Sequence, residues 1–231
     1  DVYLLSWNTN DEKADITQLA SLPASMDNLS AAYTDRTIYV AGGNSNMAPG
    51  NTFLSMKLTA GSNWTSLPDF PGAARVQPVL AAQKAEDGVR IYLAGGFQPI
   101  QGDMEAIVPS DILSFHPATK MWKTEGELPL FEDGTHRTFT GGCAVSYGDS
   151  SILLMSGVNY DRFLAAVNRP KLIEAAEAQG DTTLVNMLQE EGKAYMHHPV
   201  EWYKFNTALL QYNTFTKEWT DLGDYEPLAR A

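Results

Sequence analysis

The chain has 231 residues, of which 28 are acidic and 16 basic, so its formal net charge is −12. Apolar residues make up 44% and charged residues 19%, which excludes a disordered chain, and no apolar run is long enough for a membrane-spanning helix. No cluster of more than two Lys or Arg residues occurs, which argues against a nucleic-acid partner.

The first residues predict a strand and then a closing turn. Residues 2–7 are mostly apolar, and Leu22-Pro23 follows them as a turn. The chain opens with Asp-Val-Tyr-Leu-Leu, without an initiator Met or a signal peptide, and we expect that the true N-terminus lies further upstream. We interpret residues 1–28 as the back half of a repeating unit.

Three later segments repeat one pattern, in which an aliphatic run ends in glycine. They are Thr37–Gly43, Arg90–Gly96 and Ser151–Gly157. Each follows a predicted strand (30–34, 78–83, 140–147) and precedes another (52–56, 111–115, 208–212), and then a tryptophan (Trp64, Trp122, Trp219). Gly43 and Gly96 lie 53 positions apart, and a period of about 50 with a double glycine and a later Trp is typical of kelch repeats. An ordinary β-sandwich is the alternative.

The predicted fold class is therefore all-β, a kelch-type β-propeller with about three and a half of a probable six blades and a two-helix insertion. The expected units are a partial blade (1–28), two blades (29–71 and 72–130), a blade with a helical insertion (131–227), and the start of a further blade (228–231). Such a piece would leave two blade faces bare. We expect the remaining blades to be missing sequence or a second chain, and a homodimer stays open.

The third unit is longer than the second, because its Gly-to-Trp segment spans 62 positions instead of 26. The extra sequence, at about 160–197, predicts helices over 161–179 and 181–196. Asp181 is an expected N-cap, Gly180 ends the first helix, and Pro170 is expected to break or restart it. The insertion is interpreted either as a lid over the channel mouth or as a decorative subdomain.

These features together resemble a known family. The kelch pattern, the helical insertion after Ser156-Gly157, and the string from His197 to Asn206 (HHPVEWYKFN) are similar to the cyclically permuted mutarotases, the bacterial N-acetylneuraminate epimerases. The resemblance implies an isomerase that interconverts the anomers of a sialic acid by general acid–base catalysis in the propeller channel. It also implies a periplasmic location, a small sugar acid as partner, and no membrane or cofactor.

By the same resemblance, a glutamate after the insertion is the proton acceptor, and Glu201 fits that position best. Its aromatic neighbours Trp202, Tyr203 and Phe205 are expected to bury the carboxylate and to raise its pKa. The alternative is a surface glutamate at the entry of a strand. His197 and His198 lie beside it, and either is a candidate acid or hydroxyl donor, whereas a metal site is not expected because no third ligand has suitable spacing.

Further candidates would bind the substrate. Arg75, Arg137 and Arg230 precede the first strand of successive blades, so they are expected to point into the channel and bind a carboxylate, or else to pair with acidic residues between blades. Asn44 and Asn159, like Gln98, follow the glycine ends and either bind sugar hydroxyls or cap turns. Cys143, the single cysteine, is expected to be a small core residue and not a nucleophile.

A second class of function is a non-catalytic kelch propeller that binds a protein or glycan partner. A buried acid beneath a lid would favour the enzyme, whereas an exposed aromatic or charged rim would favour the binding module. A sialidase is disfavoured because the chain lacks its Ser-x-Asp-x-Gly-x-x-Trp repeat. A copper oxidase is also disfavoured, because it would need a Cys–Tyr pair and two spaced histidines, whereas His197 and His198 are adjacent.

Overall fold

The computed structural model describes residues 1–45 and 50–225. In this part of the chain the strands form three four-stranded antiparallel sheets and one two-stranded sheet. Blade 1 holds β3 (Ser30–Thr34), β4 (Thr37–Ala41), β5 (Phe53–Lys57) and β6 (Thr65–Ser66). Blade 2 holds β7 (Val76–Ala85), β8 (Gly88–Phe97), β9 (Asp111–His116) and β10 (Met121–Glu127). Blade 3 holds β11 (Cys143–Tyr147), β12 (Ser151–Met155), β13 (Ala208–Asn213) and β14 (Trp219–Asp224).

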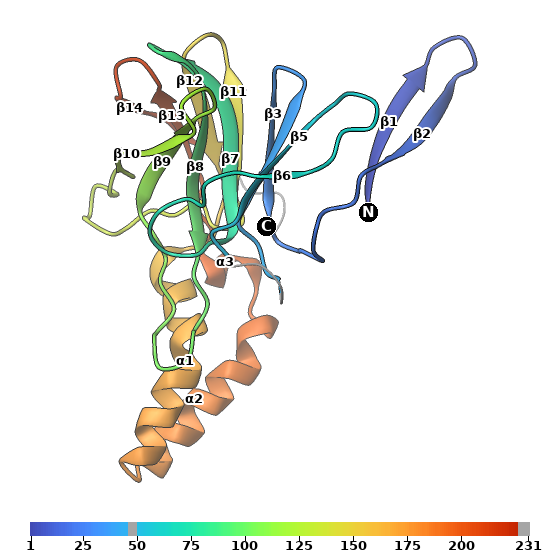
Figure 1. Cartoon of the computed structure of the whole chain (residues 1–231). Helices are drawn as coiled ribbons and strands as arrows, with labels where there is room; N and C mark the ends of the chain where they lie inside the picture. Colours follow the sequence, from blue (N-terminus) through green and yellow to red (C-terminus); the bar gives the residue numbers. More distant parts are fainter. Residues whose placement is uncertain (46–49, 226–231) are drawn as a thin grey trace.

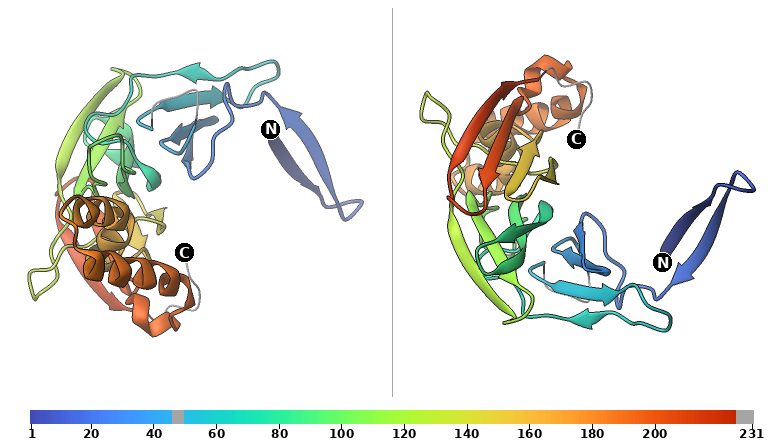
Figure 2. Two further views of the ribbon diagram at one scale, coloured as in Figure 1. Left: turned by 90° about the horizontal axis from the view of Figure 1, so that it is seen from below. Right: turned by 90° about the horizontal axis from the view of Figure 1, so that it is seen from above.

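The three blades follow one another around an open arc (Figure 2). In each blade the strands are paired in chain order, and the first strands of neighbouring blades, β3 with β7 and β7 with β11, lie next to each other. This is the arrangement of a β-propeller, in which the first strand of each blade is the innermost. The predicted fold class is confirmed.

The two-stranded sheet, made of β1 (Val2–Asn8) and β2 (Lys13–Leu19), corresponds to the outer hairpin of a blade. Its turn contains Glu12 with a positive φ, as the equivalent turns contain Lys120 and Lys217. The sequence did not lead us to predict β2. Leu5 and Trp7 of β1 are 66% and 64% exposed, because no inner strand pairs with β1 in the described chain.

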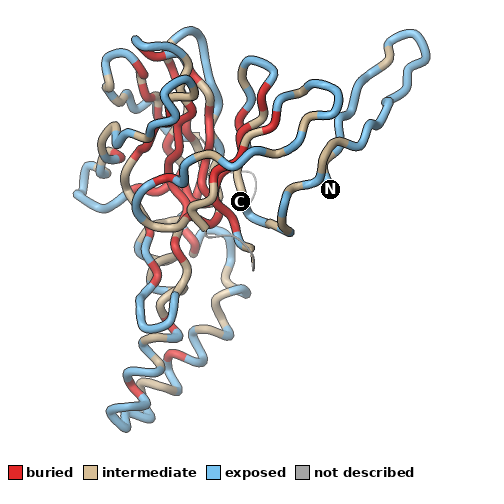
Figure 3. The backbone as a smooth tube through the Cα atoms, in the orientation of Figure 1, coloured by how far each residue is buried: buried red, intermediate tan, exposed pale blue. Residues whose placement is uncertain are grey.

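Two hydrophobic clusters fill the seams between the blades, and Figure 3 shows that burial is concentrated there. Between blades 1 and 2, Trp122 packs edge-on against Phe53 of the neighbouring blade, with ring centroids 4.9 Å apart. Its indole N–H donates to the Pro68 carbonyl at 2.8 Å, as Trp64 donates to Ala20 at 2.9 Å. The repeated tryptophans therefore join each blade to the preceding segment, as their position in the repeat predicts.

The first glycine of each double glycine touches the next blade. Gly42 and Gly95 have positive φ values of 70° and 62°. A Cβ on Gly42 would lie 2.3 Å from the Arg75 carbonyl oxygen, and one on Gly95 would lie 2.8 Å from the Phe139 carbonyl carbon. Ser156 occupies the same place in blade 3, also with a positive φ (67°). No blade that follows blade 3 is among the described residues, and the Ser156 hydroxyl accepts there from the Tyr225 hydroxyl at 2.8 Å.

The expectation for Cys143 is wrong, because this residue is exposed. It pairs with Met155 at the start of β11, as Val79 pairs with Ala94 in β7. Val79 is 2% exposed and belongs to the cluster between blades 2 and 3. Cys143 has no such cover, since it faces away from blade 2 on the last described blade.

The insertion forms α1 (Tyr160–Ala178), α2 (Thr182–Ala194), a short 3₁₀ turn (Tyr195–His197) and α3 (Val200–Tyr203). The helices α1 and α2 project together from one end of the blades (Figure 1). Asp181 caps α2 by accepting a hydrogen bond from Leu184 N at 2.9 Å, and Gly180 follows α1 with a φ of 70°, both as predicted. No helix among the described residues has the length and apolarity to cross a membrane.

Pro170 does not break the first helix, contrary to expectation. The helix α1 runs for 19 residues through it. Pro170 is exposed and Ala166, whose carbonyl loses its intrahelical partner, is only half-buried, so the helix tolerates the proline.

A buried carboxylate joins blades 2 and 3 near their outer edge. The Glu125 side chain is 1% exposed, accepts from Ser114 Oγ at 2.6 Å, and lies 3.3 Å from Lys217 Nζ of blade 3. Burial raises the pKa of Glu125, but the bonds from Ser114 and Lys123 and the charge of Lys217 outweigh it, so the pKa is lowered.

This lowered pKa predicts a pH dependence of stability. A carboxyl group with a lowered folded-state pKa stabilises the fold above its ordinary pKa of 4.5, and this contribution is lost as the pH falls below that value. We expect Glu125→Gln to cost about 2 kcal/mol at pH 7 and progressively less at acidic pH. Urea unfolding of both proteins between pH 3 and pH 7 would test this, and a pH-independent difference would contradict it.

Candidate functional site

The stretch that follows the helical insertion is fixed by a stack of three side chains. The His198 ring lies parallel to the Trp202 ring, with centroids 3.9 Å apart. The Arg162 guanidinium lies 4.5 Å from the centroid of the same indole ring, and its Nη1 donates to the Trp202 carbonyl. Arg162 belongs to α1, so this stack anchors α3 to the first helix of the insertion.

A polar cavity of about 200 Å³ lies beside this stretch, between three loops of blade 3. The first loop precedes β11, the second joins β12 to α1, and the third joins α3 to β13. The polar side chains of its lining include His136, Asn159, Tyr160, Lys204, Asn206 and Thr207. The His136 and Tyr160 rings lie 4.9 Å apart, and Asn206 is held by a bond from its side-chain nitrogen to the Ser156 carbonyl at 3.0 Å.

The structure places the candidate base Glu201 in the first turn of α3, where it is exposed. The expectation that its aromatic neighbours bury the carboxylate is wrong in the described part of the chain. Those rings pack on one another instead: Trp202 on His198, and Tyr203 on Phe205 with centroids 5.4 Å apart. His197 is exposed in the preceding 3₁₀ turn. The structure therefore brings Glu201, His197 and His198 onto one short stretch.

The two described arginines of the repeat lie inside their own blades. Arg75 is 0% exposed, and its Nη2 lies 2.5 Å from Asp111 of β9. Arg137 is 7% exposed, pairs with Asp221 of β14 at 3.1 Å, and has its guanidinium 4.0 Å from the Phe131 ring centroid. The expectation that they point into the channel is wrong for Arg75, which is fully buried. The alternative, pairing with acidic residues between blades, is also wrong, because both carboxylate partners belong to the same blade as the arginine. Each guanidinium ties the entry of its blade to a later strand.

The other candidates are dispersed. Asn44 is tied to Asp27, whose carboxylate accepts from Asn44 Nδ2 at 2.8 Å, at the entry of blade 1. Asn159 caps α1 and also lines the cavity. Gln98 accepts from Ala74 N at 3.1 Å. Arg230 lies outside the described residues, among which no group of three or more His, Cys, Asp or Glu side chains is arranged to hold a metal ion.

The sequence reasoning missed His136, Tyr160 and Lys204, which line the cavity. His136 directly precedes Arg137 in a segment that we considered only for its arginine, and Lys204 lies within the string that carried the family resemblance. A local signal existed in both cases. The sequence does not show that they meet in one cavity, because about 70 residues separate His136 from Lys204 along the chain.

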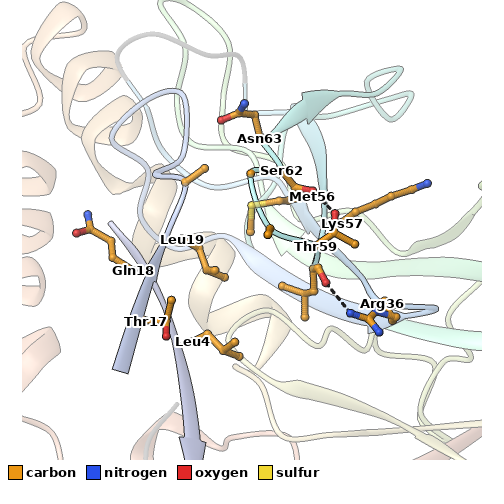
Figure 4. A pocket seen from close by; sticks show the side chains of 14 residues that line it. Leu4, Thr17, Gln18, Leu19, Arg36, Met56, Lys57, Thr59, Ser62 and Asn63 are labelled. Carbon is orange, nitrogen blue, oxygen red and sulfur yellow. Dashed lines mark hydrogen bonds between the residues drawn. The ribbon is translucent and has the colours of Figure 1, made fainter. Parts of the chain in front are cut away.

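A second hollow, of about 520 Å³, lies between the β1–β2 hairpin and blade 1 (Figure 4). Leu4, Leu19 and Met56 line it, and Arg36 at its edge donates to the Leu58 carbonyl at 3.1 Å. None of its described lining residues is a carboxylate or an imidazole. Because acid–base chemistry needs such groups, the cavity of blade 3 is the better candidate site.

The role of Asn159 as a cap leads to a testable expectation. Its side-chain oxygen accepts from Arg162 N at 3.1 Å at the start of α1. We expect Asn159→Ala to lower the unfolding free energy by about 1 kcal/mol and Asn159→Ser to restore most of it. Chemical denaturation would measure both. Equal losses for the two substitutions would show that the cap does not stabilise the helix.

Fold and site together define a β-propeller with a helical insertion next to a polar cavity. The family described as N-acetylneuraminate epimerase matches residues 19–231. The chain belongs to this family.

Individual relatives carry the same name. The chain is 28% identical over 204 residues to the N-acetylneuraminate epimerase of Haemophilus influenzae (strain PittEE). The aligned region covers 87% of this chain and 48% of that relative. It is 24% identical over 219 residues to that of Pasteurella multocida (strain Pm70), covering 93% and 50%. The chain thus spans about half the length of the curated relatives that it matches.

A solved structure supports the fold. The structure titled "Structure of YjhT" has a TM-score of 0.67 to this chain at 20% sequence identity, over 90% of this chain and 54% of the other. At this identity the likeness concerns the fold alone.

Proposed function

We propose that the protein interconverts the α and β anomers of N-acetylneuraminate by general acid–base catalysis. The main support is the family match over residues 19–231, together with the names of the relatives. The structure adds one observation: the stretch after the insertion carries a carboxylate and two imidazoles, and it leads directly into a polar cavity. Acid–base chemistry on a hydroxylated sugar requires groups of these kinds.

In the proposed reaction the sugar ring opens at the anomeric carbon and closes again on the other face. Glu201 takes the proton of the anomeric hydroxyl, and His198 or His197 protonates the ring oxygen. Return of both protons after rotation about the carbon–carbon bond completes the inversion without a net change in the enzyme. No metal or cofactor is required in this proposal.

The setting of the reaction is part of the proposal. The blades are kelch repeats, and further blades, from the remaining sequence or from a second chain, close the ring. The channel of the closed ring then covers the exposed Glu201 and lowers its contact with water. We place the enzyme in the periplasm, as the family resemblance implies.

The test is the rate of anomer exchange. The α anomer of N-acetylneuraminate, released freshly by a sialidase, would be followed by NMR with and without the full-length protein. We expect exchange well above the spontaneous rate at catalytic protein concentration. An unchanged rate would refute the proposed activity.

A second candidate is a propeller that binds a sugar acid without converting it. The exposure of Glu201 favours this alternative, since a base in water is less suited to proton abstraction at neutral pH. The same NMR samples distinguish the two. Saturation transfer from protein to sugar without accelerated exchange would support the binding module, whereas accelerated exchange would exclude it.

A further inference from the structure

The residue Lys204 has an unusual backbone conformation beside the cavity. It ends α3 with φ 47° and ψ 53°, in the left-handed region. A position of this kind at a helix C-terminus is normally filled by glycine or asparagine, because a larger side chain is strained there. Strained residues gather at binding sites, where the surrounding structure holds them for a purpose.

The surroundings of Lys204 are able to hold it. On its N-terminal side, Trp202 contacts both the His198 ring and the Arg162 guanidinium. Tyr203 is 6% exposed, and its hydroxyl donates to the Tyr195 carbonyl at 2.5 Å. On its C-terminal side, Asn206 N donates to the Gly157 carbonyl at 2.9 Å. The backbone on both sides of Lys204 is thus fixed, and Lys204, itself exposed, is one of the residues that line the cavity.

Lys204 differs from the arginines described above in having no charged or hydrogen-bonded partner for its side chain in the described part of the chain. Arg75 and Arg137 are paired with carboxylates of their own blades, and Arg162 is bound to the Trp202 carbonyl. Lys204 lines the cavity, and its ammonium group has no ion pair or side-chain hydrogen bond to another described residue. In a chain with a formal charge of −12, an anion needs a local cation in order to bind.

We propose that the Lys204 ammonium group binds the carboxylate of an acidic sugar in this cavity. His136, Tyr160 and Asn159 line the same cavity and carry groups that can bond to sugar hydroxyls. The inference deepens the proposed function, because it assigns the recognition of the carboxylate to a lysine after the insertion and not to the arginines of the repeat. It predicts a site that distinguishes sugar acids from neutral sugars.

The test compares two ligands and three proteins. Binding of N-acetylneuraminate and of its uncharged methyl ester would be measured by NMR titration with the wild type, Lys204→Gly and Lys204→Arg. We expect Lys204→Gly to weaken binding of the acid by about 10- to 100-fold and to leave binding of the ester nearly unchanged. Lys204→Arg should retain much of the affinity for the acid, because it keeps the charge.

The glycine variant also controls for folding. Glycine adopts the left-handed region without strain, so the thermal unfolding midpoint of Lys204→Gly should not fall below that of the wild type. Lys193→Met, which removes an exposed lysine of α2 that is paired with Glu190, is the matched control for the loss of charge and should bind like the wild type.

Three results would overturn the assignment: affinity for the acid within twofold of wild type, equal losses for acid and ester, or no binding of the acid by the wild type. The outcome is separable from that of the proposed function. If the acid bound through Lys204 but the protein did not accelerate anomer exchange, the site would stand and the epimerase would be refuted. If the protein accelerated exchange but the Lys204 variants bound the acid as tightly as the wild type, the epimerase would stand and the site would be refuted.

Discussion

Replacing Glu201 by glutamine is expected to slow anomer exchange by about 10²- to 10⁴-fold, the usual contribution of a general base. Glutamine has nearly the same shape but cannot accept a proton from the anomeric hydroxyl. Because Glu201 is exposed on α3, the variant should unfold at the same temperature as the wild type. NMR exchange rates at saturating sugar would measure the effect on the chemical step.

The matched control is Glu177→Gln, since Glu177 is an exposed glutamate on α1 of the same insertion. Its exchange rate should equal that of the wild type. If Glu201→Gln also kept the full rate, the base would have to be another residue. His198→Gln and His197→Gln would then be the next variants, because both histidines lie on the same stretch.

Replacing Arg75 by methionine is expected to lower the unfolding free energy by about 3 kcal/mol. The guanidinium is completely buried, lies 2.5 Å from Asp111 and donates to the Gly95 carbonyl at 3.1 Å. Burial lowers the pKa of Arg75, and the charge of Asp111 opposes that shift. Methionine would fill much of the space but would leave the Asp111 carboxylate and the Gly95 carbonyl without their partner.

The double variant Arg75→Met with Asp111→Asn should recover part of this loss, because it no longer leaves a carboxylate uncompensated. Arg36→Met serves as the control, since Arg36 is an exposed arginine whose guanidinium donates to the Leu58 carbonyl. Urea unfolding would measure all three proteins. A loss below about 0.5 kcal/mol for Arg75→Met would contradict a structural role for the buried pair.

Much of the fold could be predicted from the sequence because each blade repeats the same local pattern. Aliphatic runs that end in Ala-Gly-Gly, such as the one before Gly96, specify both a buried strand and its close contact with the next blade. The strand β2 was missed, since its Lys13–Leu19 sequence mixes polar and apolar residues without clear alternation. Pro170 was misjudged because the sequence does not show which face of the helix is exposed.

The candidate site was less predictable, since it depends on contacts between distant segments. The resemblance pointed to the stretch around Glu201, but its exposure follows from aromatic rings that pack on one another. Arg75 and Arg137 occupy equivalent positions and both pair with a carboxylate, yet the sequence could not show that these partners lie within the same blade. Lys204 escaped notice because no residue pattern announces a lysine in a left-handed conformation.

The serine that replaces the first glycine in blade 3 changes how the repeat should be interpreted. At Gly42 and Gly95 the backbone of the following blade leaves no room for a β-carbon, so selection for glycine acts through the neighbour. The blade that would face Ser156 is not among the described residues, while Gly157 is constrained by Thr138 and Phe139 at the entry of its own blade. The second glycine therefore belongs to the blade, and the first records a tight seam with the next one. A substitution of Gly42 or Gly95 would therefore disturb the contact between two blades, whereas one of Gly43, Gly96 or Gly157 would disturb the entry of a single blade.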